Sequence, residues 1–352
     1  MTRRAVKHRF DLVDLAGYRE GLTFVFLVAT FAASILANSH FVDTANLSFI
    51  LTNAVEIGLM TLTTTMLIVM GEIDISVASI IGLSAAVLGQ LVMWNVPFAL
   101  AALLALGAGL LAGLVNGILC VTLRLSSLVV TLTTFILYRG IAGLILKDNT
   151  VTAFPTWFMS WDLSRAFWFI SWPVIFGIAA TIVAILVLHR MRVGRQIYLM
   201  GANPLAARYS GLRVDRTKIL MFGASGLVSA VAALLLVSRT VSLDNTTGTG
   251  LELVVITAVL LGGTDFRGGR GTILGSFMAV ALIAVLENSL RLAEVSGQIT
   301  TAIVGGLLIL SIAISAGVAA FQRRARSETP RQQGDRDMVW TKEPSAIDER
   351  SR

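Results

Sequence analysis

Residues 190–218 read RMRVGRQIYLMGANPLAARYSGLRVDRTK and form a basic segment between two strongly apolar halves of the chain. The segment holds seven arginine and lysine residues against one acid, Asp215. Basic loops that flank membrane spans usually lie on the cytoplasmic side. Its centre, GANPLAARYSG (residues 201–211), is long enough for a short helix rather than a single turn. We therefore expect a cytoplasmic loop, residues 189–218, that joins two membrane-embedded halves.

The composition predicts that most of the chain lies in lipid. Of its 352 residues, 55% are hydrophobic and only 14% are charged, against about 25% charged in an ordinary soluble domain. The mean hydropathy is +0.80, and windows such as residues 175–188 carry no charge. The single cysteine, Cys120, lies in an apolar run and cannot form an intramolecular disulfide. The fold class is therefore all-α, a polytopic membrane helical bundle.

About ten stretches are expected to cross the membrane. They are residues 22–37, 54–70, 77–93, 98–121, 128–146, 173–188, 219–237, 251–261, 272–290 and 299–320. Residues 251–261 are too short to cross about 30 Å of hydrocarbon as one helix, so they form a broken helix or borrow residues from the loop before them. Residues 46–53 are short and amphipathic and are expected to lie on the outer surface before the second span.

The distribution of basic residues predicts the orientation. They gather on one side, at the chain start, Arg124, residues 190–218, Arg267, Arg270 and residues 323–326. Both termini are then cytoplasmic. We expect a cytoplasmic or interfacial N-terminus (1–20), a transmembrane domain (21–321) and a disordered cytoplasmic tail (322–352). The net charge of +7 fits membrane lipid headgroups and topology, so no nucleic acid partner is expected.

Charged residues at or inside the spans are candidates for a translocation path, because a charge in lipid is costly unless paired or hydrated. The candidates are Glu56, Asp74, Arg139, Glu252 and Glu287. Arg139 is the deepest, with the three glutamates as possible partners, either as structural ion pairs or as groups lining the path. Asp74 and Ser76 either line the path or cap the following helix.

Motifs for nucleotide binding and catalysis are absent from the sequence. There is no GxxxxGK[ST], no GxGxxG after a strand, no HExxH and no CxxC, and the three histidines are scattered. We therefore expect no catalytic, cofactor or metal site. Residues 71–82 (GEIDISVASIIG) share an ordered glycine and aspartate pattern with residues 262–275 (GGTDFRGGRGTILG). This echo arises either from an internal repeat, as in many transporters, or by chance.

Three motifs together resemble the membrane permease subunits of bacterial ABC importers of the ribose type. They are GEIDISVASIIGLSAAV (71–87), GRQIYLMGANPLAARYSGLRVDRTKI (194–219) and AVLLGGTDFRGGRGTILGS (258–276), and the similarity covers roughly residues 20–320. Within that family the chain is similar to permeases for rhamnose and for the quorum-sensing autoinducer sugar. Glu72 departs from the pattern, because relatives commonly carry glycine there.

The resemblance implies a location in the bacterial inner membrane and a set of partners. Two permease subunits, identical or paralogous, form the pore, and two cytoplasmic ABC ATPase subunits supply work. A periplasmic or lipid-anchored binding protein delivers a monosaccharide. The ATPase-coupling residues it implies are Gly201, Asn203, Ala206, Ala207, Ser210 and Gly211. Independently, Asn203 and Pro204 are typical of a helix cap and first turn.

Two functional hypotheses follow. The first is the pore-forming, non-enzymatic permease subunit of an ATP-driven importer of a pentose, a rhamnose-like sugar or an autoinducer-type sugar, with ATP hydrolysis on the partner. The second is a secondary transporter driven by an ion gradient, in which Arg139 and the buried carboxylates relay ions. Dependence of uptake on a separate ATPase distinguishes the two.

Overall fold

The structure is a computed structural model that describes residues 7–147, 149–161, 164–310 and 313, with side chains from residue 20 onward. Residues 1–6 of the expected N-terminal region, the end of the expected last span (299–320) and the expected tail (322–352) lie outside the described residues. The described part is almost entirely helical. The predicted all-α membrane fold is thereby confirmed.

Seven helices are long and apolar enough to cross a membrane. They are α1 (Lys7–Ala37), α2 (Thr44–Val69), α4 (Phe98–Thr122), α5 (Ser127–Leu146), α7 (Trp172–His189), α10 (Val214–Thr240) and α12 (Ile273–Leu292). Three shorter apolar helices, α3 (Val77–Met93), α11 (Leu251–Leu261) and Gly297–Leu310, accompany them. The total of about ten spans and the side on which the termini lie stay predictions.

The start of α2 differs from the sequence prediction. Residues 46–53 are part of one continuous helix, Thr44–Val69, so this helix begins well before the predicted second span (54–70). The reason is local: the short 3-10 helix Ser39–Val42 turns the chain, and its Phe41 is fully buried. Asn46 donates to the Phe41 carbonyl (2.8 Å) and accepts from Asn288 (3.0 Å). Its amide therefore has partners inside the protein rather than on a membrane surface.

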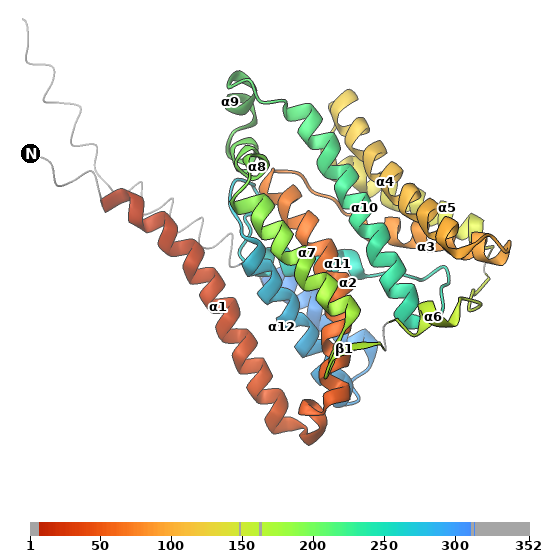
Figure 1. Cartoon of the computed structure of the whole chain (residues 1–352). Coiled ribbons are helices and arrows are strands. Elements are labelled where there is room, and N and C mark those ends of the chain that lie inside the picture. The colour runs from red at the N-terminus through yellow and green to blue at the C-terminus, as the bar shows by residue number, and fades with distance from the viewer. Residues whose placement is uncertain (1–6, 148, 162–163, 311–312, 314–352) are drawn as a thin grey trace, which may run out of the picture. The chain divides into compact units, whose positions relative to one another are not determined.

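Helix α2 is the central element of the bundle. It packs against α7, α10, α11 and α12, which lie around it in Figure 1. Nearly every side chain from Val55 to Val69 is buried, including four threonines, Thr61, Thr63, Thr64 and Thr65. A helix buried on all sides transmits a displacement at either end to all of its neighbours.

Helices α4 and α10 pack through small residues. A Cβ atom added to Gly113 would lie 2.2 Å from the Phe222 carbonyl oxygen, and one added to Gly109 would lie 2.5 Å from the Ala230 Cβ. Because glycine has no side chain, the two backbones can approach closely, as in many membrane helix pairs. Glycines in these two spans therefore serve helix packing.

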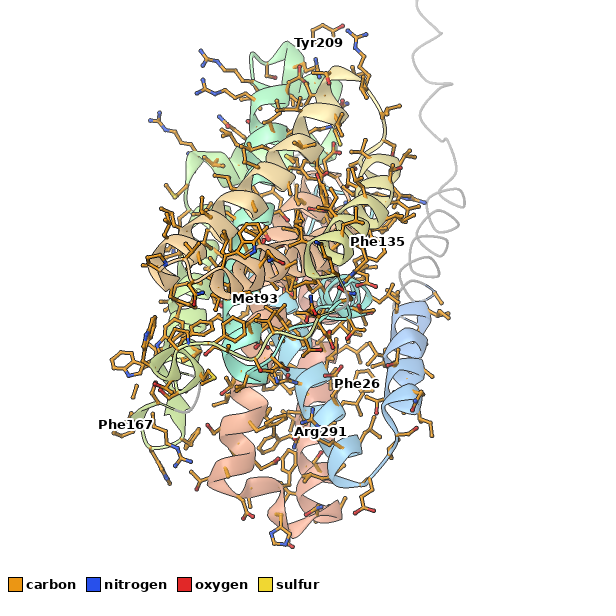
Figure 2. The ribbon with its side chains drawn as sticks, turned by 90° about the vertical axis from the view of Figure 1, so that its right-hand side faces the viewer. Phe26, Met93, Phe135, Phe167, Tyr209 and Arg291 are labelled. Atoms are coloured by element: carbon orange, nitrogen blue, oxygen red, sulfur yellow. The ribbon has the colours of Figure 1, made fainter. Side chains whose placement is uncertain are left out.

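The end opposite the basic segment carries short elements rich in aromatic residues. Helix α6 (Thr156–Met159) precedes a two-stranded antiparallel hairpin of β1 (Arg165–Phe167) and β2 (Ile170–Ser171). Trp157, Trp168 and Trp172 are exposed there, as expected for an interfacial aromatic belt. Figure 2 shows Phe167 toward this end and Tyr209 at the other.

Candidate functional site

The basic segment folds into two short helices, α8 (Arg192–Ala202) and α9 (Pro204–Tyr209). Asn203 between them is extended (φ −160°, ψ 100°), and its side chain accepts a hydrogen bond from the Ala206 amide at 3.0 Å. Pro204 occupies the first turn of α9, where its missing amide hydrogen costs nothing. The predicted cap and first turn are confirmed. We call residues 192–211 the coupling segment.

The surface that α9 offers to a partner differs from the predicted set. Ala207 is only 4% exposed and packs inside the chain, whereas Ala206 is exposed. The largest exposed apolar side chains are Leu205 (67% exposed) and Tyr209 (91%). Sequence reasoning missed both, although they are the bulky apolar residues of an otherwise small and polar stretch. Tyr is enriched among the residues that dominate protein interfaces, so these two exposed side chains are candidates for contact with a partner protein.

The other predicted coupling residues shape the end of the segment. The Ser210 hydroxyl donates to the Ala206 carbonyl at 2.9 Å, which closes the last turn of α9. Gly211 follows with φ +80°, a left-handed conformation that favours glycine. Beyond it the chain enters α10, so these residues fix the angle between α9 and a transmembrane helix.

The coupling segment is anchored to the end of α2 and to the turn between α11 and α12. A Cβ atom added to Gly201 would lie 1.9 Å from the Val69 carbonyl oxygen and 2.5 Å from the Gly269 amide nitrogen. That amide donates to the same Val69 carbonyl at 2.7 Å. The Tyr198 hydroxyl donates to the Gly271 carbonyl at 2.6 Å. A movement of α8 is therefore passed directly to both structures.

Glu72, the residue that departs from the family pattern, pairs with Lys218 of α10. Both side chains are largely buried. The pair ties the turn after α2 to the far end of the basic segment. The extra carboxylate thus has a specific partner, and the turn gains a contact to α10.

The five predicted path residues do not form one cluster. Glu56 is buried and its carboxylate accepts from Arg239 of α10, with 2.8 Å between Oε1 and Nε and 3.3 Å between Oε2 and Nη2. The suggested Arg139 partnership with Glu56 is therefore wrong, because α2 packs beside α10 whereas α5 packs on α3 and α4. Arg239, which lies at the end of an apolar span, was missed.

Arg139 donates its hydrogen bond to the backbone, and of its three predicted partners only Glu252 lies close enough to interact with its charge. Its Nη1 donates to the Thr247 carbonyl at 2.7 Å, and Gly82 leaves the room it needs, since a Cβ there would lie 2.9 Å from that nitrogen. Glu252 accepts from the Gly250 amide at 3.1 Å. Arg139 and Glu252 thus hold the same loop, residues 241–250, from two helices.

Glu287 takes part in a separate interaction, with a residue of its own helix α12. Its charge interacts with Arg291, one turn further along α12. The Arg291 guanidinium lies 4.2 Å from the centre of the Phe49 ring, within the range of a cation–π contact. The suggested pairing of Glu287 with Arg139 is therefore not what the structure has.

Asp74 is the centre of a buried polar network without a cation. Its Oδ1 accepts from the amide and hydroxyl of Ser76 (2.9 and 2.6 Å), and its Oδ2 accepts from the Ser225 hydroxyl (3.0 Å). The Asn116 amide donates to the Ser76 hydroxyl at 2.7 Å, and Tyr138 donates to Asn116 at 3.0 Å. Asp74 bonds the amide just before α3, so it orders the helix start while linking it to α4, α5 and α10. Asn116, Tyr138 and Ser225 were missed, although polar residues in apolar spans are a usable signal.

Comparison with known proteins defines the class. Residues 46–312 match the family described as "Branched-chain amino acid transport system / permease component", and the chain belongs to this family of transport permeases. It is 37% identical over 283 residues to the Autoinducer 2 import system permease protein LsrD of Yersinia enterocolitica, covering 79% of this chain and 85% of that protein. It is 38% identical over 284 residues to LsrD of Escherichia coli K12 (78% and 85%). The predicted importer permease of the bacterial inner membrane is confirmed.

Proposed function

We propose that the chain is the pore-forming subunit of an ATP-driven importer and that its cargo is a small neutral sugar of the autoinducer or monosaccharide type. A second permease subunit completes the pore, cytoplasmic ATPase subunits bind the coupling segment, and a periplasmic or lipid-anchored binding protein delivers the cargo. The relatives named for autoinducer 2 import support this cargo class. The family description instead names branched-chain amino acids, which makes these the competitor to test.

The buried polar groups of the central helix α2 support an uncharged cargo. The one carboxylate of this helix, Glu56, is already paired with Arg239, so α2 offers no free counter-charge to an amino acid headgroup. The helix instead carries a run of buried threonine hydroxyls, which suit hydrogen bonding to an uncharged polyol.

Coupling follows from the anchoring of α8. Closure of the ATPase subunits would displace α9, and the close contact of Gly201 with Val69 and Gly269 would pass the displacement to α2 and to the α11–α12 turn. Because α2 touches four neighbouring helices, a small shift at its end changes their packing. The result is a switch between outward and inward access.

The single observation that carries this proposal is the capped helix α9 with its exposed Leu205 and Tyr209. Changing both to glutamate should abolish association with the ATPase and ATP-dependent uptake. The reason is that two charges would then replace apolar side chains that the ATPase buries in the complex. Folding should persist, because both side chains are exposed. Phe167→Glu, which places a charge on an exposed aromatic residue at the opposite end, is the matched control and should keep association.

Uptake into proteoliposomes distinguishes the alternatives. We expect transport of an autoinducer-type sugar only with the ATPase, the binding protein and ATP present. Uptake driven by a proton or sodium gradient without the ATPase would support the ion-driven transporter instead. Preference for leucine over the sugar would overturn the cargo while leaving the coupling proposal intact.

A further inference from the structure

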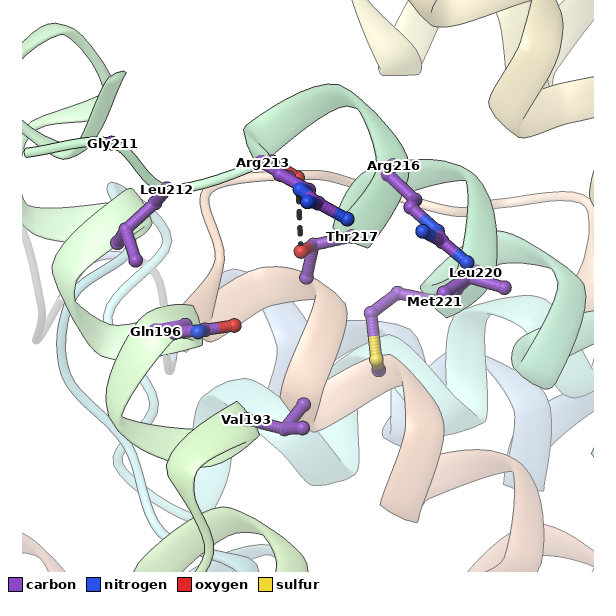
Figure 3. A pocket seen from close by; sticks show the side chains of 9 residues that line it. All are labelled: Val193, Gln196, Gly211, Leu212, Arg213, Arg216, Thr217, Leu220 and Met221. Atoms are coloured by element: carbon purple, nitrogen blue, oxygen red, sulfur yellow. Dashed lines mark hydrogen bonds between the residues drawn. The ribbon is translucent and has the colours of Figure 1, made fainter. Parts of the chain in front are cut away.

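A pocket of about 360 Å³ lies between α8 and the start of α10, beside the coupling segment. Its polar lining consists of Gln196, Arg213, Arg216 and Thr217. Figure 3 shows Arg213 just before α10 and Arg216 on its first turn, with Gln196 across the pocket on α8. The Thr217 hydroxyl donates to the Arg213 carbonyl at 3.1 Å, which orders this first turn.

The positive charge of the pocket has no counterion within the part of the chain that the structure describes. Neither Arg213 nor Arg216 forms an ion pair there. The nearby acids are already used, since Asp215 pairs with Arg208 and Glu72 pairs with Lys218. The pocket therefore attracts an anion from outside the chain.

The apolar lining continues from the arginines toward the membrane. Leu220, which is 57% exposed, lies one turn after Arg216 on the same face of α10. Val193 on α8 is also exposed, and Met221 lines the floor between them. An exposed arginine followed one turn later by an exposed leucine suits a ligand with a charged head and an apolar tail, since each part meets a matching side chain. The pocket lies between these two kinds of lining.

We propose that this pocket binds the headgroup of an anionic phospholipid from the cytoplasmic leaflet. Arg213 and Arg216 hold the phosphate, Gln196 bonds the glycerol part, and an acyl chain follows Leu220 and Met221. Basic pockets at the cytoplasmic side of membrane proteins are suited to such headgroups. The bound lipid joins α8 to α10 and so stabilises the coupling segment against the membrane.

Native mass spectrometry of the full-length protein in detergent, titrated with phosphatidylglycerol or phosphatidylcholine, tests this assignment. We expect one tightly bound phosphatidylglycerol per chain and weaker phosphatidylcholine binding. The double variant Arg213→Gln/Arg216→Gln should lose about 25-fold in phosphatidylglycerol affinity, from about fivefold for each basic residue. The matched control Arg190→Gln/Arg192→Gln changes two basic residues outside the pocket and should lose less than about twofold. An equal loss in both would overturn the site in favour of a diffuse basic surface.

Two further measurements separate the possible occupants. Thr217→Trp fills the pocket without changing its charge and should also lose the lipid, and unchanged binding in this folded variant would overturn the proposal. Millimolar inorganic phosphate should not displace the lipid, because it lacks an acyl chain, and full displacement would point to a soluble anion. If the arginine double variant instead weakens ATPase association equally in phosphatidylcholine and phosphatidylglycerol nanodiscs, the pocket is a protein-docking site and the lipid assignment fails.

Discussion

Two turns that contain glycine and aspartate, residues 71–76 and 262–271, have the same local hydrogen bond, but the aspartate is buried in the first turn and partly exposed in the second. In the first, the Ser76 amide donates to Asp74 at 2.9 Å, and in the second the Arg267 amide donates to Asp265 at 3.0 Å. Asp74 is 1% exposed and is embedded in a network across three helices. Asp265 is partly exposed and bonds only its own turn. The comparison teaches that burial, rather than turn type, decides how much a turn residue stabilises the protein.

The two turns also pack against each other. A Cβ atom added to Gly268 would lie 2.9 Å from the Cα of Gly71, and both turns lie next to Gly201 of the coupling segment. Each follows an apolar helix and precedes another, α2 and α3 in the first case and α11 and α12 in the second. This shared geometry supports the internal echo of residues 71–82 and 262–275, whose origin as a repeat stays a prediction.

The largest effect is expected from Asp74→Ala. The change leaves the Ser76 amide and two hydroxyl groups without their acceptor in a buried site, and we expect a loss of about 3 kcal/mol in the free energy of unfolding. Thermal unfolding of the purified protein in detergent measures it. Asp74→Asn keeps one acceptor oxygen and should lose clearly less. A stability of Asp74→Ala equal to that of the unchanged protein would contradict the assigned network.

The contact between the turns and the coupling segment is tested by Gly201→Ala. The new methyl group meets the Val69 carbonyl and the Gly269 amide, both backbone groups, so α8 must shift away from both turns. We expect a loss of about 2 kcal/mol in the free energy of unfolding and a strong fall in ATP-dependent uptake. Gly140→Ala is the control, since a methyl group added to Gly140 of α5 meets no atom within 4 Å and should leave stability and uptake nearly unchanged. Equal uptake by the two variants would exclude transmission through Gly201.

Tyr198→Phe tests the attachment of the second turn to α8. The variant lacks the hydrogen bond to the Gly271 carbonyl, and we expect its free energy of unfolding to fall by about 1 kcal/mol at neutral pH. Burial, helped by the charge of Glu20, raises the pKa of Tyr198 from 10.0 to about 12. Between these values the unfolded chain releases the proton first, so the unchanged protein loses stability as the pH rises. The stability difference between the unchanged protein and the variant should therefore narrow and then reverse from pH 10 to 12 in chemical unfolding curves. Equal stability of the two at neutral pH would contradict the bond, and a difference that stays constant up to pH 12 would contradict the raised pKa.

The helical membrane fold was predictable because apolar length and basic loops are local properties of the sequence. Charge pairing was not, because it depends on how helices are rotated and which of them are neighbours. Glu56 and Arg239 lie 183 positions apart, and no periodicity reveals that α2 packs beside α10. Arg139 was matched with glutamates by charge alone, whereas α5 places it beside a loop carbonyl.

The position of helix α9 was predictable from the sequence, but the face that it exposes was not. Its cap is encoded by adjacent residues, Asn203 and Pro204, so the sequence contains all the necessary information. Helix α9 has only six residues, too few for a hydrophobic periodicity to separate the inner face from the outer. Ala207 was therefore taken for a docking residue, and Leu205 was overlooked.

The smallest effect is expected from Asp265→Ala, the counterpart of the Asp74 change in the surface turn. The variant loses one bond to the Arg267 amide, and because that exposed amide can bond to water instead, we expect a loss of only about 0.5 kcal/mol. Thermal unfolding of both variants gives the ratio of the two losses in the free energy of unfolding. The loss in Asp74→Ala should be several-fold larger. Similar losses in the two variants would mean that turn geometry rather than burial sets the energy, and the contrast drawn between the two turns would be wrong.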